Sequence, residues 1–101
     1  MATNQEDPAL GTADTEAETT TRPDGGKIVR YDCGWLGCDA MPMVVRRHLQ
    51  SVEVGDVVEF VVYDPSSKED TPPFCRMLGH RILSVEPQED GAHVIRVERA
   101  R

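Results

Sequence analysis

The sequence predicts an α+β fold, in which two helices cover one face of a mixed four-stranded sheet. Apolar and polar residues alternate at 27–32, 81–86 and 92–98, as they do in half-buried strands. A run of β-branched and aromatic residues at 57–63 is typical of a central strand. Helix-start signals fall between the first and second of these strands in chain order and between the second and third, so the element order is βαβαββ. Two helices and four strands in residues 27–101 indicate a two-layer α/β sandwich.

The first half of this unit is expected to place a helix directly after a strand. Residues 27–32 form the expected first strand, whose C-terminal end leads into the segment 33–38. Pro42 suits the first turn of a helix, and Asp39 is the expected N-cap. The residues that follow make a short amphipathic helix, which is expected to end near Gln50.

In the second half we expect a turn, a short helix and a closing hairpin. The stretch Asp64-Pro65-Ser66-Ser67 has the composition of a turn. Asp70 and the Pro-Pro pair after it mark the opening of a helix over 73–78, and Gly79 ends that helix. The two alternating strands near the C-terminus then pair as a hairpin.

Residues 1–26 are predicted to be a disordered acidic tail, and residues 27–101 to be the folded domain. Six acidic residues against one basic residue give the tail a net charge of −5, out of −7 for the whole chain. Large apolar side chains are almost absent from the tail, so it cannot bury enough surface to fold. The domain itself has twelve acidic and ten basic residues and is nearly neutral.

Charge and hydropathy exclude several classes of function. A nearly neutral domain lacks the broad basic surface on which phosphate-tracking nucleic-acid binders depend. No run approaches the roughly 18 apolar residues of a membrane span, and the N-terminus lacks the features of a secretory signal. We therefore expect a cytoplasmic protein. Its three cysteines, an odd number without an export signal, argue against a structural disulfide framework.

Cys38 is the residue most informative of function, because it lies where the first strand leads into the first helix. Helix N-termini favour a thiolate over a thiol and can activate a cysteine for nucleophilic chemistry. The same position would arise if Cys38 were a small apolar residue buried under the helix. Its neighbour Asp39 favours the protonated thiol and opposes activation. The residues alone leave both interpretations open.

In the second half of the chain, a series of short motifs resembles the TusA/SirA-like family of small sulfur carriers. The family shares the βαβαββ order and has an Asp-Pro turn, a helix-opening aspartate, a Phe-Cys pair and a Gly-His stop. The corresponding stretches here are Asp64-Pro65-Ser66-Ser67, Asp70, Phe74-Cys75-Arg76 and Gly79-His80.

The first half is similar to the family in outline and departs from it at one motif. The family has a Leu-Asp pair, a glycine and then Cys-Pro-x-Pro at the head of the first helix. Here Tyr31-Asp32 precedes Cys38, and the resemblance extends from residue 27 to residue 99. Asp39 and Met41 replace the two family prolines, and a proline follows one position later.

The resemblance implies a protein that accepts sulfane sulfur as a persulfide from a cysteine desulfurase or a rhodanese and passes it to an acceptor protein. Cys38 would be the residue that holds the sulfur. Persulfide transfer is nucleophilic attack on sulfur, governed by thiolate fraction, leaving group and access, so it needs no metal or cofactor. We expect a monomer that acts by docking to its partners.

Docking has to bring two cysteines within reach, so residues near Cys38 are candidates for partner binding. Arg46 and Arg47 on the first helix are two of them, with a solvated helix face as the alternative. Trp35, the only tryptophan, is a candidate anchor for a partner or a lid over the thiol, with simple loop packing as the alternative. Cys33, at the end of the first strand, is expected to be buried or half-exposed close to Cys38, and the alternative is a role as a resolving thiol for Cys38.

The remaining cysteine and the histidines are expected to have structural roles. Cys75 is expected in the core. His80 is expected to stabilise the end of the second helix or the next strand. His48 and His93 are expected at the surface.

Two other functions stay open. Cys33, Cys38, Cys75 and His80 together supply the inventory of a Cys3His zinc site, although their spacing does not obviously make them converge. A non-catalytic interaction domain on the same fold would account for the missing family prolines.

Overall fold

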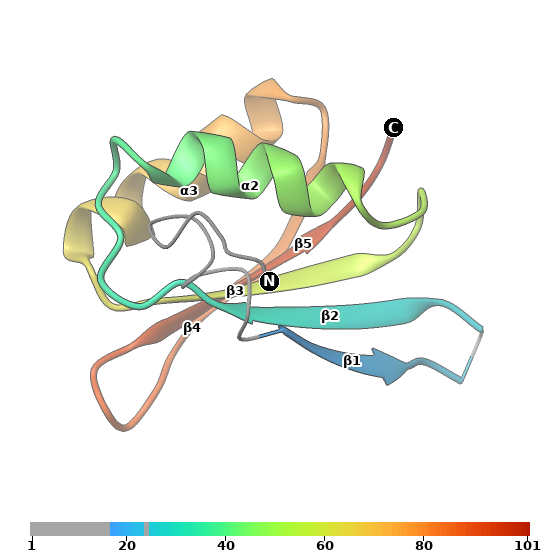
Figure 1. Ribbon diagram of the computed structural model, residues 1–101, viewed down its shortest axis with the longest axis horizontal. Coiled ribbons are helices and arrows are strands. Elements are labelled where there is room, and N and C mark those ends of the chain that lie inside the picture. Colours follow the sequence, from blue (N-terminus) through green and yellow to red (C-terminus); the bar gives the residue numbers. More distant parts are fainter. Residues whose placement is uncertain (1–16, 24) are drawn as a thin grey trace, which may run out of the picture.

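The computed structural model describes residues 17–23 and 25–101, which form a five-stranded sheet with two helices packed on it (Figure 1). In chain order the elements are β1 (Ala17–Thr21), β2 (Lys27–Asp32), α2 (Met41–Gln50), β3 (Val57–Val62), α3 (Pro65–Met77), β4 (Arg81–Pro87) and β5 (His93–Glu98). Across the sheet the strand order is β1-β2-β3-β5-β4, in which β2 and β3 are parallel and the other neighbours antiparallel. Figure 1 shows both helices on the same face of the sheet. The predicted α+β class with a mixed sheet is confirmed.

The prediction of four strands is wrong, because the sheet has a fifth strand at its edge. β1 pairs antiparallel with β2, and its Thr19 lies opposite Val29. A turn closes this hairpin, in which the Arg22 N–H donates to the Gly26 carbonyl at 2.6 Å. The threonine run in β1 is β-branched and favours an extended strand once a neighbour is there to pair with. The rest of the predicted acidic tail, residues 1–16, lies outside the described residues.

The first helix follows the prediction in extent but not in its cap. α2 runs from Met41 to Gln50, with Pro42 in its first turn as expected. The N-cap is Ala40, which makes no side-chain capping hydrogen bond, so the prediction of Asp39 as the cap is wrong. The start of α2 therefore keeps its N–H groups unshielded by a side-chain cap.

The second helix is longer than predicted and begins earlier. α3 spans 13 residues, because Asp64 adopts an extended conformation and accepts the Ser66 N–H at 2.8 Å, with Pro65 in the first turn. The predicted turn at 64–67 is therefore the cap and first turn of α3. The Pro-Pro pair that was expected to open the helix lies inside it.

The core lies between the sheet and the helices. Alternate residues of β3 and β5 point toward the apolar side of α2, as the two-residue period of a strand requires. The largest fully buried side chains of this core are Phe60, Met41, Leu49, Ile95, Val45, Val58, Val62 and Val97. Within the described residues, no helix combines the length and the apolar character that crossing a membrane requires.

His48 was predicted at the surface, and that prediction is wrong. Its side chain is buried, and its ring stacks on that of Tyr31 with 3.4 Å between the centroids. The helical period explains the burial, because His48 follows Val44 by four residues and Val45 by three and so lies on the same face of α2.

The opposite face of the sheet holds an ion-pair ladder centred on Glu59 of β3. The Glu59 side chain is 8% exposed, and its carboxylate accepts the Nε–H groups of Arg30 at 2.8 Å and Arg96 at 2.6 Å. Arg96 also reaches Glu86 on β4 at 3.3 Å, so the ladder joins β2, β3, β5 and β4. Burial raises the pKa of Glu59, but the hydrogen bonds from Arg96 and Arg30 outweigh it and hold the pKa below its usual range.

We expect Glu59→Gln to lower the free energy of unfolding by about 1.5–3 kcal/mol at pH 7, the usual contribution of hydrogen bonds to a charged group. Because folding lowers the pKa of Glu59, its stabilisation is complete above the ordinary value of 4.5 and is lost as the pH falls through the folded value. Urea unfolding at several pH values should show the gap between wild type and variant closing in acid.

The matched control is Glu69→Gln, which removes an exposed carboxylate on α3 that pairs only with Lys68 among the ion pairs of the described residues. This change is expected to leave the free energy of unfolding nearly constant. Equal values for wild type and Glu59→Gln at pH 7 would contradict the stabilising role of the ladder.

Candidate functional site

The segment between β2 and α2, residues 33–40, continues the pairing of β2 with β3 before it turns away. The Cys33 N–H donates to the Val61 carbonyl at 2.8 Å. The Tyr63 N–H donates to the Gly34 carbonyl at 3.0 Å. Gly34 has a φ of +57°, in the left-handed region that glycine adopts without strain. The chain therefore leaves the sheet at a fixed point.

α3 holds the middle of the same segment. Ser67 is fully buried, and its hydroxyl donates to the Leu36 carbonyl at 2.6 Å. Ser67 lies in the first turn of α3, which Asp64 caps. The segment that leads to Cys38 is therefore connected to both β3 and α3.

Cys38 is exposed and lies in the turn that precedes α2. In that turn the Gly37 carbonyl accepts the N–H groups of Ala40 and Met41, at 3.0 and 3.1 Å. The first turn of α2 has no acidic side chain and no side-chain cap. The partial positive charge of this helix start is therefore not neutralised by a side chain of its own first turn.

Asp39 follows Cys38 in the same turn and is exposed. Its carboxylate lies close to Gly37, where an added Cβ would come within 3.1 Å of Asp39 Oδ1. The turn that presents Cys38 therefore also carries a carboxylate.

All three cysteines lie in the described part of the chain and are thiols, but only Cys38 is exposed. Cys33 is 3% exposed, and its Sγ lies 3.9 Å from the Tyr31 carbonyl oxygen. Cys75 is fully buried, as predicted, and burial raises its pKa to about 12. A thiol with that pKa is protonated at neutral pH and inert. Cys38 is therefore the cysteine that an external partner can reach, and a resolving role for Cys33 stays a prediction.

The predicted partner-binding residues all lie at the surface. Arg46 and Arg47 are exposed on α2 and line a groove of about 460 Å³, which shares Pro42 with the wall beside Cys38. Trp35 is 73% exposed and belongs to the same loop as Cys38. The roles of these three residues in partner binding stay predictions.

The four residues of the Cys3His alternative have different environments. Two of its cysteines are buried and the third is exposed. His80 Nδ1 accepts the Ala100 N–H at 3.2 Å, and burial together with the charges of Arg99 and Arg101 lowers the pKa of His80. Across the described residues, no group of three or more His, Cys, Asp or Glu side chains could hold a metal ion.

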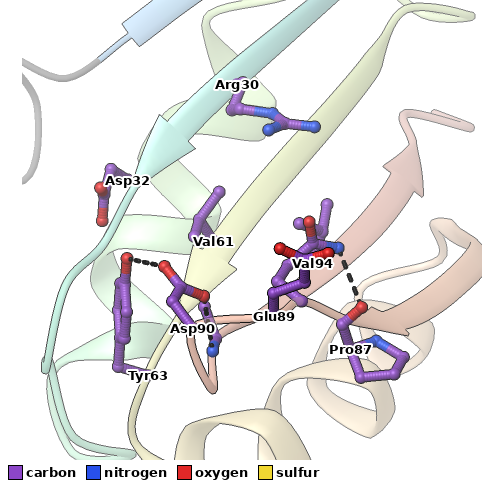
Figure 2. Close-up of a pocket in the computed structure, with 10 residues that line it drawn as sticks. Arg30, Asp32, Val61, Tyr63, Pro87, Glu89, Asp90 and Val94 are labelled. Carbon is purple, nitrogen blue, oxygen red and sulfur yellow. Dashed lines mark hydrogen bonds between the residues drawn. The ribbon is translucent and has the colours of Figure 1, made fainter.

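A separate hollow of about 660 Å³ lies at the ends of β3 and β5 (Figure 2). Tyr63 donates its O–H to Asp90 Oδ2 at 3.1 Å, and Asp90 Oδ1 accepts the Ala92 N–H at 3.1 Å. The hydrogen bond to Asp90 raises the pKa of Tyr63. These polar groups bond to one another, and the described residues that line the hollow include no cysteine. The candidate site is therefore the one at Cys38.

Sequence reasoning missed a small hollow directly beside Cys38. It is lined by Cys38, Met41, Pro42, Val45, Asp70, Thr71 and Phe74. Asp70 and Thr71 were assigned to the segment before the second helix, whereas the earlier start of α3 places them on it. The signal that could have placed Thr71 on a helix is the four-residue spacing of Ser67, Thr71 and Cys75, which puts these small residues on one helix face.

Comparison with known proteins identifies the family. Residues 32–99 match the family described as "Sulfurtransferase TusA". The chain belongs to this family. It is 34% identical over 59 residues to the sulfur carrier protein TusA of Pseudomonas putida strain F1, covering 58% of this chain and 71% of that protein. It is 38% identical over 63 residues to a putative sulfur carrier protein of Archaeoglobus fulgidus, covering 62% of this chain and 86% of that protein.

We expect iodoacetamide to alkylate the native protein once, at Cys38, because the other two thiols are buried. Peptide mass spectrometry after a short treatment at pH 7.5 should locate the adduct, and Cys38→Ser should abolish it. Denaturation with guanidinium before treatment should expose all three cysteines and serves as the control. Modification of Cys33 or Cys75 in the native protein as fast as that of Cys38 would contradict this assignment.

Proposed function

We propose that this protein is a cytoplasmic sulfur carrier, which holds sulfane sulfur as a persulfide on Cys38 and relays it between two partner proteins. The observation that supports this proposal is the exposure of Cys38 at the start of α2, while the other two cysteines are buried. Membership in the TusA family supports the same role. The donor would be a cysteine desulfurase or a rhodanese-type protein, and the acceptor a downstream sulfur-accepting protein.

The chemistry needs an accessible thiolate and a docked partner. The Cys38 thiolate attacks the outer sulfur of a persulfide on the donor, and a new S–S bond forms at Cys38 Sγ. The S–S bond of the donor breaks, and its electron pair leaves on the donor cysteine, which takes up a proton. Release to the acceptor repeats this step with the roles exchanged. Neither step changes the total number of sulfane sulfurs or requires an external oxidant.

The geometry favours this exchange in two ways. The anchored segment 33–40 presents Cys38 at the surface in a defined position, so little ordering is needed when a partner docks. The uncapped start of α2 favours the attacking thiolate. Asp39 moderates this second effect, so Cys38 is expected to be a weaker nucleophile than it would be beside a neutral residue.

We propose that Arg46, Arg47 and Trp35 form the partner-binding surface. Both arginines lie on α2 beyond Cys38, where they can attract an acidic surface on the donor or acceptor. Trp35 offers a large exposed aromatic side chain, a residue type that often anchors protein interfaces. The groove beside the two arginines shares Pro42 and Phe74 with the hollow that borders Cys38.

Incubation with a cysteine desulfurase and cysteine should add the mass of one sulfur atom to the intact protein. We expect Cys38→Ser to abolish the gain and Cys75→Ala to retain it, because Cys75 is buried. Treatment with a reductant should remove the added sulfur. Failure of the wild type to gain sulfur from either a desulfurase or a rhodanese would instead favour a non-catalytic interaction domain on the same fold.

Reversing the charges in Arg46→Glu/Arg47→Glu should slow sulfur transfer from the donor by about tenfold at low salt, because electrostatic attraction speeds association. The difference should shrink as ionic strength rises. Arg81→Glu, which changes an arginine on β4 with a 72% exposed side chain, is the matched control and should transfer sulfur normally. Equal transfer rates for the double variant and the control would contradict a role of these two arginines in docking.

A further inference from the structure

The hollow beside Cys38 has the size of one atom. Its volume is about 20 Å³, and about 10–15 Å³ is enough to hold a single water molecule. α2 contributes Met41, Pro42 and Val45 to its wall, and α3 contributes Asp70, Thr71 and Phe74. The hollow therefore lies in the seam between the two helices and borders the thiol.

Thr71, one of the wall residues, has an unsatisfied polar group. The residue is 2% exposed, and among the described residues its Oγ1 has no hydrogen-bond partner. Buried hydroxyls are nearly always bonded, and a helical threonine usually bonds the carbonyl one turn earlier. A buried hydroxyl that is left unpaired in this way lowers the stability of the fold. An unpaired buried hydroxyl of this kind is expected where the hydroxyl binds a ligand.

We propose that this hollow receives the outer sulfur of the Cys38 persulfide, and that the Thr71 O–H donates a hydrogen bond to it. This inference rests on the proposed function of Cys38. A persulfide adds one heavy atom beyond Sγ, which matches the size of the hollow. As an anion, the outer sulfur accepts a hydrogen bond, and the Thr71 hydroxyl supplies a donor that the fold leaves unused.

The other wall residues define the environment of that sulfur. Met41, Val45 and Phe74 are apolar and limit the access of water. Asp70 is the charged residue of the wall, but it is exposed, so solvent screens its repulsion of an anion. The hydroxyl of Thr71 is buried and acts where the dielectric constant is lower, which strengthens its hydrogen bond.

This hydrogen bond has a kinetic consequence. When an acceptor attacks the outer sulfur, the S–S bond breaks and the electron pair moves to Cys38 Sγ. Negative charge therefore leaves the outer sulfur, and the hydrogen bond from Thr71 weakens as the reaction proceeds. Because the bond stabilises the loaded state more than the transition state, Thr71 slows loss of sulfur to small nucleophiles.

The test uses the full chain loaded with sodium tetrasulfide, so that it is independent of any donor protein. The Cys38 thiolate takes one sulfur from the polysulfide and releases a shorter polysulfide. Excess cyanide then removes the outer sulfur as thiocyanate and restores the thiolate, and the rate is followed by intact mass. We expect Thr71→Val to lose sulfur about tenfold faster than the wild type, the change expected for one hydrogen bond to a charged acceptor.

Two further variants separate the hydroxyl from the shape of the side chain. Thr71→Ser keeps the donor and should restore slow loss, while Thr20→Val makes the same substitution at an exposed site on β1 and should behave as wild type. Thr71→Val should unfold at no lower urea concentration than the wild type, because the hydroxyl it removes is unsatisfied. A purely structural hydroxyl would show the reverse, a less stable variant with an unchanged cyanide rate.

The outcomes distinguish this inference from the proposed function. If the wild type loads at Cys38 and all variants lose sulfur at the same rate, the role of Thr71 is overturned and Cys38 remains the carrier. If the wild type gains no sulfur at Cys38 from tetrasulfide, both proposals are overturned.

Discussion

The parallel pairing of β2 with β3 is the constraint on which the site depends. The C-terminal ends of parallel strands meet at one edge of a sheet, and here each of these strands is followed by a helix. The cysteine segment after β2 and the start of α3 after β3 therefore emerge next to each other, where the Ser67 hydroxyl joins them through the Leu36 carbonyl. The same arrangement brings Thr71 to the wall beside Cys38.

One face of the sheet carries the ion-pair ladder that stabilises it, and the other face carries the helices and the candidate site. The ladder around Glu59 links four strands on the face that the helices leave open. The helix face buries the apolar core and leaves Cys38 exposed at its edge. At that edge Cys38 lies between the sheet and the uncapped start of α2, with Asp39 as its neighbour in the turn.

Local patterns in the sequence were sufficient to predict the fold class, the central strand and the position of Cys38 before a helix. They failed where distant partners decide the outcome. β1 depends on pairing with β2, and the polar composition of its threonines concealed it. The start of α3 depends on the Asp64 cap, which outweighs the signal from Pro72 and Pro73. The hollow beside Cys38 requires two helices to pack together, so no single segment could reveal it.

The most direct test of the account is a crystal structure of the sulfur-loaded protein, with the sulfur atoms located by their anomalous scattering. We predict one additional sulfur bonded to Cys38 Sγ and lying in the hollow against Thr71. Additional sulfur on Cys33 or Cys75, or an unmodified Cys38 in crystals of protein shown by mass to be loaded, would contradict the role of Cys38 as the carrier.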